Sequence, residues 1–300
     1  MPLTRPGGSE PRDLDLTRRS LGAFLFGGAA LTAFPALAQA TPPIRTPTDG
    51  LVAGMVSIPT GGRALPAYVA RPDARGAFPA IIVVSEAFGL HEYIRDVCRR
   101  LARHGYVAIA PDYFFRAGDP SRMTDAAAIQ KIGEAATNAQ VMNDTGATLA
   151  WLSGQRFATR DVGITGFSWG GAVVWMACDR FPELKAGVAW YGRLIKPDTG
   201  FLADEARLWP IEIAPRLRTP VLGLYAGRDQ GISPDEVDTM REVLRRARRS
   251  RSSIFVYPEA QHGFHADYRS TYHAAYANDG WARMLDHFAR NGLRPPRLRR

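Results

Sequence analysis

The chain has 300 residues, 46% of them hydrophobic and 22% charged, with a formal net charge of +9. No internal repeat or long low-complexity tract divides it, which excludes a repeat architecture and leaves one α/β domain with a substantial core as the expectation. The excess positive charge lies in residues 245–251 and 294–300, where no aromatic residue interleaves the arginines, so we expect no nucleic acid as a partner.

The first forty residues have the pattern of an export signal. The pair Arg18-Arg19 precedes a short apolar stretch rich in Gly and Ala, and Ala-Gln-Ala at 38–40 is a small-residue cleavage site. The stretch ends without a charged stop-transfer flank, which argues against a stable membrane anchor. We therefore predict a twin-arginine signal peptide over residues 1–40, with the Tat export machinery as a partner and a periplasmic or secreted chain beginning at Thr41.

Beyond a proline-containing, flexible lead-in over residues 41–53, apolar runs alternate with amphipathic stretches. We predict helices at 93–104 and 274–291, and strands at 55–58, 65–71, 80–85, 107–110, 162–165, 186–190, 221–225 and 254–257. This order predicts a doubly wound, mostly parallel sheet in a single domain over residues 54–292, followed by a basic tail at 293–300. Functional residues are expected at the carboxyl ends of the strands. Whether the polar, alanine-rich residues 116–143 cover the site as a helical lid is left open.

A serine stands between two glycines where a predicted strand meets a predicted helix. In Gly166-Phe-Ser168-Trp-Gly170 the glycines permit the sharp turn of a nucleophile elbow, because a Cβ at either position would clash. The backbone N–H of Trp169 and the helix N-terminus would then lie beside the exposed hydroxyl. The alternative is a glycine-rich turn with a buried or capping serine.

An acid and a histidine follow the next strand ends in the order Ser, Asp, His. Asp229 comes after the strand at 221–225 and His262 after the strand at 254–257, which is the chain order of an α/β-hydrolase triad. Serine needs an imidazole to take its proton, and a carboxylate must hold that ring in the correct tautomer. Four residues compete for these roles and do not directly follow a strand end: His265, Asp198, Asp235 and Asp267.

The two cysteines, Cys98 and Cys178, fall in predicted helices that would cover opposite faces of the sheet, so we expect buried thiols and no disulfide. Neither has a partner at metal-ligand spacing. The two basic segments are interpreted as a solvated helix end and a tail. Contact with an anionic lipid or an envelope polymer is the alternative for them.

Six stretches of the chain closely resemble the dienelactone hydrolase family: residues 85–96, 104–113, 166–171, 190–192, 227–229 and 261–264. The resemblance runs from about residue 55 to residue 291. It implies an α/β-hydrolase fold and hydrolysis of a lactone or related ester, without a metal or an organic cofactor.

The same resemblance implies roles for individual residues. Ser168 is similar to the family nucleophile, His262 to its base, Asp229 to its orienting acid, and Glu86 to a glutamate that contacts the resting nucleophile. The backbone N–H groups of Ala87 and Trp169 would form the oxyanion hole. For Glu86 the alternative is an ion pair with an arginine such as Arg95.

The chain departs from the family pattern in two ways. The best-known members have a cysteine nucleophile where this chain has serine. They also hold the substrate carboxylate with an arginine a few residues beyond the histidine, and residues 264–269 have no arginine at the matching place, so dienelactone is not carried over as the substrate. Aromatic residues on predicted strand-end loops are expected to line the site, namely Phe88, Tyr113, Phe115 and Tyr191.

The predicted function is therefore a serine hydrolase that cleaves a small ester or lactone through an acyl-enzyme. An acyltransferase or a peptidase with the same triad is the nearest alternative. A binding protein that keeps the fold without catalysis is an alternative of another class, and fluorophosphonate labelling would discriminate it.

Overall fold

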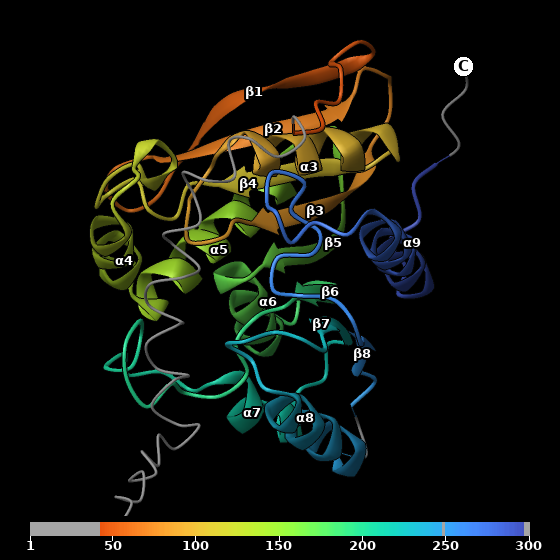
Figure 1. Ribbon diagram of the computed structural model, residues 1–300. Coiled ribbons are helices and arrows are strands. Elements are labelled where there is room, and N and C mark those ends of the chain that lie inside the picture. Colours follow the sequence, from red (N-terminus) through yellow and green to blue (C-terminus); the bar gives the residue numbers. More distant parts are fainter. Residues whose placement is uncertain (1–42, 248–249, 297–300) are drawn as a thin grey trace, which may run out of the picture.

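The computed structural model describes residues 43–247 and 250–296. The predicted signal peptide, its cleavage site, and parts of both basic segments lie outside these residues. The described chain forms one eight-stranded sheet in the order β1-β2-β4-β3-β5-β6-β7-β8 (Figure 1). The strands are β1 (Leu51–Ile58), β2 (Leu65–Pro72), β3 (Phe78–Val84), β4 (Val107–Pro111), β5 (Ala158–Phe167), β6 (Leu184–Trp190), β7 (Val221–Ala226) and β8 (Ser253–Tyr257).

The first two strands run against the rest of the sheet. β1 pairs with β2 and β2 with β4 in antiparallel fashion, whereas every pairing from β4 through β3 to β8 is parallel. A strand in the middle of such a sheet is covered on both faces, and all of β3 is buried as this requires. The predicted fold class, a single α/β domain with a doubly wound, mostly parallel sheet, is confirmed.

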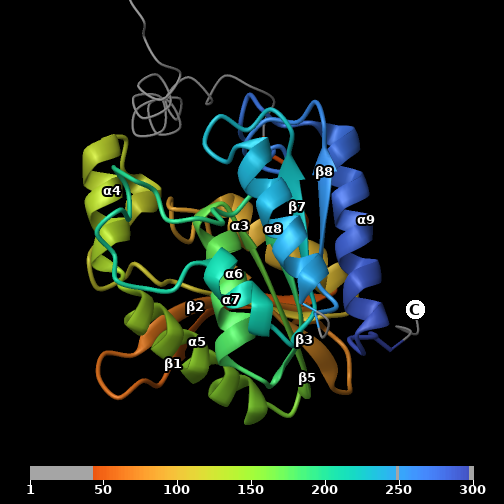
Figure 2. The same ribbon diagram turned by 90° about the horizontal axis from the view of Figure 1, so that it is seen from below.

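Helices pack on both faces of the sheet and define two cores. The helices are α3 (Glu92–Arg103), α4 (Ala126–Ala135), α5 (Asn138–Ser153), α6 (Trp169–Arg180), α7 (Pro210–Ile213), α8 (Pro234–Arg246) and α9 (Ala274–Arg290). Apolar residues of α5, α6 and α8 bury against one face, and those of α3 and α9 against the other. Figure 2 shows α8 and α9 on the two sides of β7 and β8.

The cysteines follow this division. Cys98 of α3 belongs to one core and Cys178 of α6 to the other, and both are buried free thiols. Burial raises the pKa of each thiol far above its ordinary value, because a thiolate would have to lose its hydration. Both residues therefore act as small core side chains.

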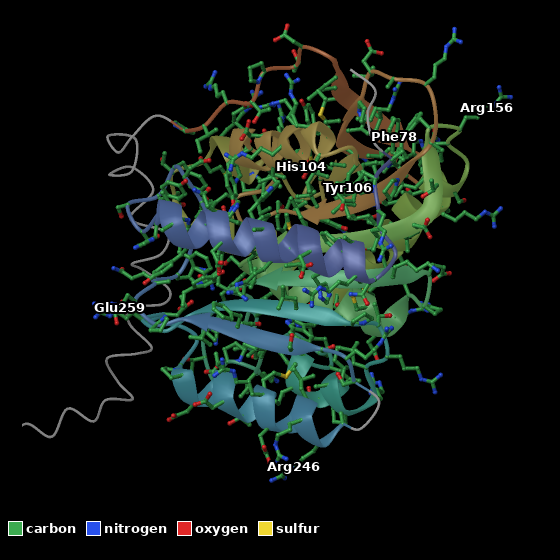
Figure 3. All side chains as sticks on the ribbon, turned by 90° about the vertical axis from the view of Figure 1, so that its right-hand side faces the viewer. Phe78, His104, Tyr106, Arg156, Arg246 and Glu259 are labelled. Atoms are coloured by element: carbon green, nitrogen blue, oxygen red, sulfur yellow. The ribbon has the colours of Figure 1, made fainter. Side chains whose placement is uncertain are left out.

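The carboxyl ends of the parallel strands meet at one edge of the sheet. Glu259, two residues beyond β8, lies at the opposite edge from Phe78 at the start of β3 and from Arg156 just before β5 (Figure 3). The loops that follow β3, β5, β6, β7 and β8 therefore gather at one side of the molecule.

The segment predicted as a flexible lead-in, residues 41–53, makes specific contacts with the domain in its described part. β1 begins at Leu51, so the last part of the lead-in belongs to the sheet. Before it, the Thr46 N–H donates to Asp96 and the Arg99 Nε donates to the Thr46 carbonyl at 2.9 Å. Arg103 likewise donates to the Pro47 carbonyl. Charged side chains of α3 thus attach this segment to the domain.

Within residues 43–247 and 250–296 no helix has the length and apolar character needed to cross a bilayer. The same residues contain no cluster of three or more side chains suited to hold a metal ion.

Candidate active site

Ser168 sits at the strained turn between β5 and α6. Its φ of +53° and ψ of −113° are rare for a residue with a side chain, and such strain persists only where neighbouring structure enforces it. The Ser168 N–H donates to the Trp190 carbonyl at 2.9 Å, which fixes the turn to β6. A Cβ on Gly170 would lie 2.5 Å from the Ser85 carbonyl oxygen, so only glycine allows α6 to approach β3 this closely.

Three predicted residues form one hydrogen-bonded line. The Ser168 Oγ lies 2.9 Å from His262 Nε2, and His262 Nδ1 lies 2.7 Å from Asp229 Oδ2. The other oxygen of Asp229 accepts the N–H groups of Gly231 at 2.9 Å and Ile232 at 3.1 Å. These bonds fix the carboxylate, which orients the imidazole toward the serine.

The loop after β8 holds His262 from its other side. The Thr271 hydroxyl donates to the His262 carbonyl at 2.8 Å, and Gly263 follows with a φ of +78°. The Tyr191 ring meets the imidazole edge to face, with 5.1 Å between centroids. The imidazole is therefore positioned by packing as well as by Asp229.

The competing histidine and acids lie away from the Ser168 hydroxyl. His265 is buried, with its Nδ1 2.6 Å from the Tyr93 hydroxyl and its ring stacked between Phe167 and Trp281. Burial, aided by the Arg100 charge, lowers the pKa of His265 to about 3, so its ring is neutral. Among the competing acids, Asp267 forms an ion pair with Arg100, whereas Asp198 and Asp235 are exposed.

The expected oxyanion-hole residues stand on either side of the elbow. β3 is the sheet neighbour of β5, so Ala87, just after β3, reaches the same cleft as Trp169. Trp169 is the first residue of α6, and the first N–H groups of a helix have no partner within it. Both residues line the cleft beside Ser168, where an oxyanion could accept from two N–H groups.

Glu86 is fully buried and surrounded by three partners. The Tyr268 hydroxyl donates to Oε2, His91 Nε2 lies 3.5 Å from the same oxygen, and an Arg269 nitrogen lies 3.3 Å from Oε1. Burial opposes ionisation, but the Arg269 charge and the His91 and Tyr268 hydrogen bonds outweigh it and lower the pKa of Glu86 to about 2. The arginine beside Glu86 is thus Arg269, where Arg95 was the alternative considered from sequence.

Ser168 and His262 line a cleft with a volume of about 100 Å³. Its walls are mostly apolar, as small-molecule sites usually are. Phe88 and Tyr191 line it as predicted. Besides these residues and the oxyanion-hole pair, the walls are formed by Ile129, Gln130, Ala172, Arg193, Phe201, Leu202, Arg207, Ile232 and Arg269.

Two predicted lining residues lie elsewhere. Tyr113 is fully buried, with its hydroxyl 3.0 Å from the Thr145 hydroxyl of α5, and Phe115 packs against the core beneath the Arg116 guanidinium. The sheet order explains the correction, because β3 separates the end of β4 from the elbow at the end of β5.

Arg269 reaches the cleft although it is seven positions beyond His262 and not at the place that the resemblance indicates. The chain turns after Gly263 so that the Arg269 side chain packs against this glycine, where a Cβ would lie 2.7 Å from the Arg269 Cδ. The loop therefore supplies an arginine to the cleft wall, although none stands at the place that the resemblance indicates.

Two segments outside the motifs line the cleft, and for one of them the sequence had left a covering role open. Ile129 and Gln130 belong to α4, and Phe201, Leu202 and Arg207 to the loop between β6 and α7. α4 meets the loop where Gly133 leaves room for the Phe201 ring, and the N–H of Asn138, the first residue of α5, donates to Glu205 of the same loop at 2.7 Å. Helix α4, residues 126–135, lies within the stretch 116–143 and thus forms a helical wall of the cleft. From the sequence it was open whether residues 116–143 cover the site as a helical lid, and the structure places helix α4 of this stretch in the wall of the cleft.

A sequence profile of the dienelactone hydrolase family matches residues 65–292. The chain belongs to this family. It is 45% identical over 281 residues to a protein of Methylorubrum extorquens provisionally named carboxymethylenebutenolidase, covering 93% of this chain and 94% of the relative. An Escherichia coli K12 protein with the same provisional name is 45% identical over 251 residues, covering 83% and 91%.

The family resemblance extends to a solved structure. A crystal structure of a provisionally assigned dienelactone hydrolase from Klebsiella pneumoniae superposes with a TM-score of 0.75 at 46% identity, and the match covers 80% of this chain and 98% of that one. The family and the fold predicted from the motifs are confirmed, and the relatives support a hydrolase activity.

Proposed function

We propose that this protein is a serine hydrolase that cleaves a carboxylic ester or lactone through an acyl-enzyme intermediate. The observation that carries the proposal is the continuous hydrogen-bonded line from Asp229 through His262 to Ser168, which ends at a strained elbow inside an apolar cleft. Membership of the dienelactone hydrolase family supports the same reaction type.

The geometry suits each step of acyl transfer. His262 Nε2 takes the hydroxyl proton as the Ser168 oxygen bonds to the substrate carbonyl carbon, and the carbonyl oxygen becomes an oxyanion beside the N–H groups of Ala87 and Trp169. The C–O bond to the leaving alkoxide then breaks, and His262 returns the proton to it. Water repeats the sequence on the acyl-enzyme, with His262 as base, and releases the acid and the free serine.

The same residues could transfer the acyl group to another alcohol or amine, or could cleave an amide. An apolar cleft of about 100 Å³ favours a small acyl group over a peptide, because little room is left for neighbouring residues of a chain. A binding protein without catalysis has no need of the strained serine, because such strain costs about 1–3 kcal/mol and typically persists at functional sites.

Labelling and turnover together test the proposal. A fluorophosphonate probe should label Ser168 in the wild type and not in Ser168→Ala. Turnover of aryl esters and lactones should fall by several orders of magnitude in Ser168→Ala and His262→Ala, and roughly 10⁴-fold in Asp229→Asn if the carboxylate sets the tautomer. Near-normal turnover in any of the three, with native circular dichroism, would remove that residue from the triad.

A further inference from the structure

Backbone strain in the described parts of the chain is concentrated at the cleft. Three of these residues other than glycine have a positive φ, namely Ser168 at +53°, Tyr191 at +37° and Leu202 at +68°, and all three line the cleft. Ser168 is the proposed nucleophile, and the Tyr191 ring packs against the imidazole of His262. Such strain is costly and gathers at functional sites. Leu202 is the one of the three to which neither the motifs nor the family resemblance gave a role.

Leu202 occupies a turn position that usually takes glycine. The Ala203 N–H donates to the Gly200 carbonyl at 3.0 Å and closes a four-residue turn in which Leu202 is the third residue. Glycine adopts a positive φ at this position without steric cost, whereas leucine does not. The leucine is nevertheless buried, with 7% of its surface exposed. The strained turn therefore holds a buried leucine in the wall of the cleft.

The segment that carries Leu202 is fastened to two helices, and Figure 2 shows it beside α4. Gly133 inside α4 lets the Phe201 ring approach, because a Cβ there would lie 2.8 Å from two ring atoms. Glu205 accepts the N–H of Asn138, the first residue of α5, at 2.7 Å. The Glu205 N–H in turn donates to the Leu202 carbonyl at 3.2 Å. Leu202 is thus fixed from both sides, and the wall does not yield easily to a larger ligand.

The acyl part of an ester is the part that such a wall measures. In the proposed reaction the alcohol departs after the first step, whereas the acyl group stays bonded to Ser168 until water attacks. His262 protonates the departing alkoxide, and its side chain is 19% exposed, so the alcohol leaves beside the imidazole toward solvent. The acyl group must be housed among buried apolar residues, which include Leu202 and the fully buried Ile129 of α4. A cleft of about 100 Å³ holds only a short acyl chain.

We propose that Leu202 is a specificity-determining residue that limits the length of the acyl chain. The protein then accepts uncharged, short-chain acyl esters such as butyrates and excludes longer ones such as hexanoates. Leu202 acts by occupying the volume that the additional methylene groups of a hexanoyl chain need, and Ile129 borders the same cleft from α4. The inference rests on the proposed ester hydrolysis, but the size limit can also be measured as binding.

Two esters with the same leaving group test the size limit. Wild type should hydrolyse 4-nitrophenyl butyrate with a higher kcat/KM than 4-nitrophenyl hexanoate. Leu202→Ala should raise the ratio of hexanoate to butyrate kcat/KM roughly tenfold or more, because each methylene group that fits an apolar pocket contributes a factor of this order. Ile129→Ala should raise the ratio in the same direction, and it decides the question if Leu202→Ala does not fold.

A series in which the alcohol varies distinguishes the two ends of the ester. The ratio of kcat/KM values for hexyl and ethyl butyrate should be the same in wild type and Leu202→Ala. An unchanged ratio of hexanoate to butyrate in both Leu202→Ala and Ile129→Ala would overturn the size limit while leaving ester hydrolysis standing. A change confined to the alcohol series would overturn it as well.

Leu208→Ala is the matched control. Leu208 belongs to the same loop, but it is half exposed and does not line the cleft, so its loss should leave the ratio of hexanoate to butyrate unchanged. Leu202→Gly tests the strain separately. It should change the ratio as Leu202→Ala does and melt no lower than Leu202→Ala, although glycine in place of alanine usually destabilises a fold. A lower melting temperature for Leu202→Gly would overturn the strained turn on which the proposal stands.

Binding without turnover separates the size limit from the hydrolase proposal. In an NMR titration, Ser168→Ala should bind methyl butyrate more tightly than methyl hexanoate, although the longer chain is the more hydrophobic. This preference should disappear when Leu202→Ala is added. If wild type hydrolyses neither 4-nitrophenyl ester but the binding preference holds, the hydrolase proposal fails and the size limit stands. Tighter binding of methyl hexanoate to Ser168→Ala would overturn the size limit.

Discussion

Glu86 is a fully buried carboxylate held by three side chains. Its carboxylate accepts a hydrogen bond from Tyr268 and lies beside nitrogens of His91 and Arg269, whereas the Ser168 hydroxyl is hydrogen-bonded to His262. Because the pKa of Glu86 is about 2, it carries its charge at every pH suited to catalysis. That charge pairs with Arg269 in the cleft wall, and in the proposed mechanism Arg269 bounds the space from which water attacks the acyl-enzyme.

We therefore expect Glu86→Gln to slow deacylation more than acylation. Fluorophosphonate labelling of Ser168 should stay within about tenfold of wild type, or 1.4 kcal/mol, while steady-state ester hydrolysis falls further. Pre-steady-state kinetics on an aryl ester should show a burst followed by a slower steady rate. Tyr268→Phe, which keeps the carboxylate, is the control. A large parallel loss of labelling and turnover in Glu86→Gln would place Glu86 in acylation instead.

His265 links stability to pH. Its pKa is about 3 in the folded protein and near the ordinary 6.5 in the unfolded chain, so between these values the unfolded state binds the additional proton. Its contribution to stability is fully present above pH 6.5 and is lost as the pH falls toward 3, by at most about 1.4 kcal/mol per pH unit.

Replacing this histidine should flatten that dependence. His265→Gln keeps an acceptor for the Tyr93 hydroxyl, and its free energy of unfolding, measured by urea denaturation from pH 7 to pH 4, should fall less steeply than that of wild type. Equal slopes would show that His265 is protonated in the folded protein.

At the scale of elements, the elbow depends on close contact between α6 and β3. A Cβ on Gly170 would approach the backbone oxygens of Ser85 at 2.5 Å and Val84 at 2.6 Å, and backbone cannot move aside as a side chain can. The contact also places Ala87 and Trp169 in the same cleft, so a shift of α6 would change the geometry of the proposed oxyanion hole.

Gly170→Ala should therefore affect stability and activity together. We expect a loss of about 1–3 kcal/mol in the free energy of unfolding, with a larger relative loss of ester turnover because α6 is displaced from β3. Gly62→Ala is the control, since a Cβ at this turn between β1 and β2 meets no atom within 4 Å. Wild-type turnover and stability in Gly170→Ala would show that the helix can shift without cost.

At the scale of the whole molecule, the sheet brings together loops separated by long stretches of sequence. Ala87 follows β3, Ser168 follows β5, and Asp229 and His262 follow β7 and β8. Parallel pairing places all of these loops at the carboxyl ends of the strands. The antiparallel β1 and β2 extend the sheet beyond β4, at the end of the strand order opposite β8. The segment before β1 is attached to α3 through Asp96 and Arg99.

We also propose that the protein is exported in folded form by the twin-arginine pathway. Replacing Arg18 and Arg19 by lysine should leave full-length precursor in the cytoplasm, whereas wild type should yield a periplasmic chain that begins at Thr41. Fractionation followed by mass determination of the chain measures both outcomes. Processing of the double variant, or wild type that stays on the membrane with residues 1–40 intact, would contradict the proposal.

The sequence by itself determined the fold class, the family and the three residues of the hydrogen-bonded line. Each has a local signature: apolar runs of strand length, glycines around Ser168, and polar residues directly after a strand. Only the tertiary structure decided the walls of the cleft. Because β3 separates β4 from β5, Tyr113 and Phe115 do not line the cleft. Arg269 lines the cleft because the chain turns after Gly263, and Arg207 lines it because the loop at 201–207 packs against α4. These contacts join residues distant in sequence, and local patterns do not encode such pairings.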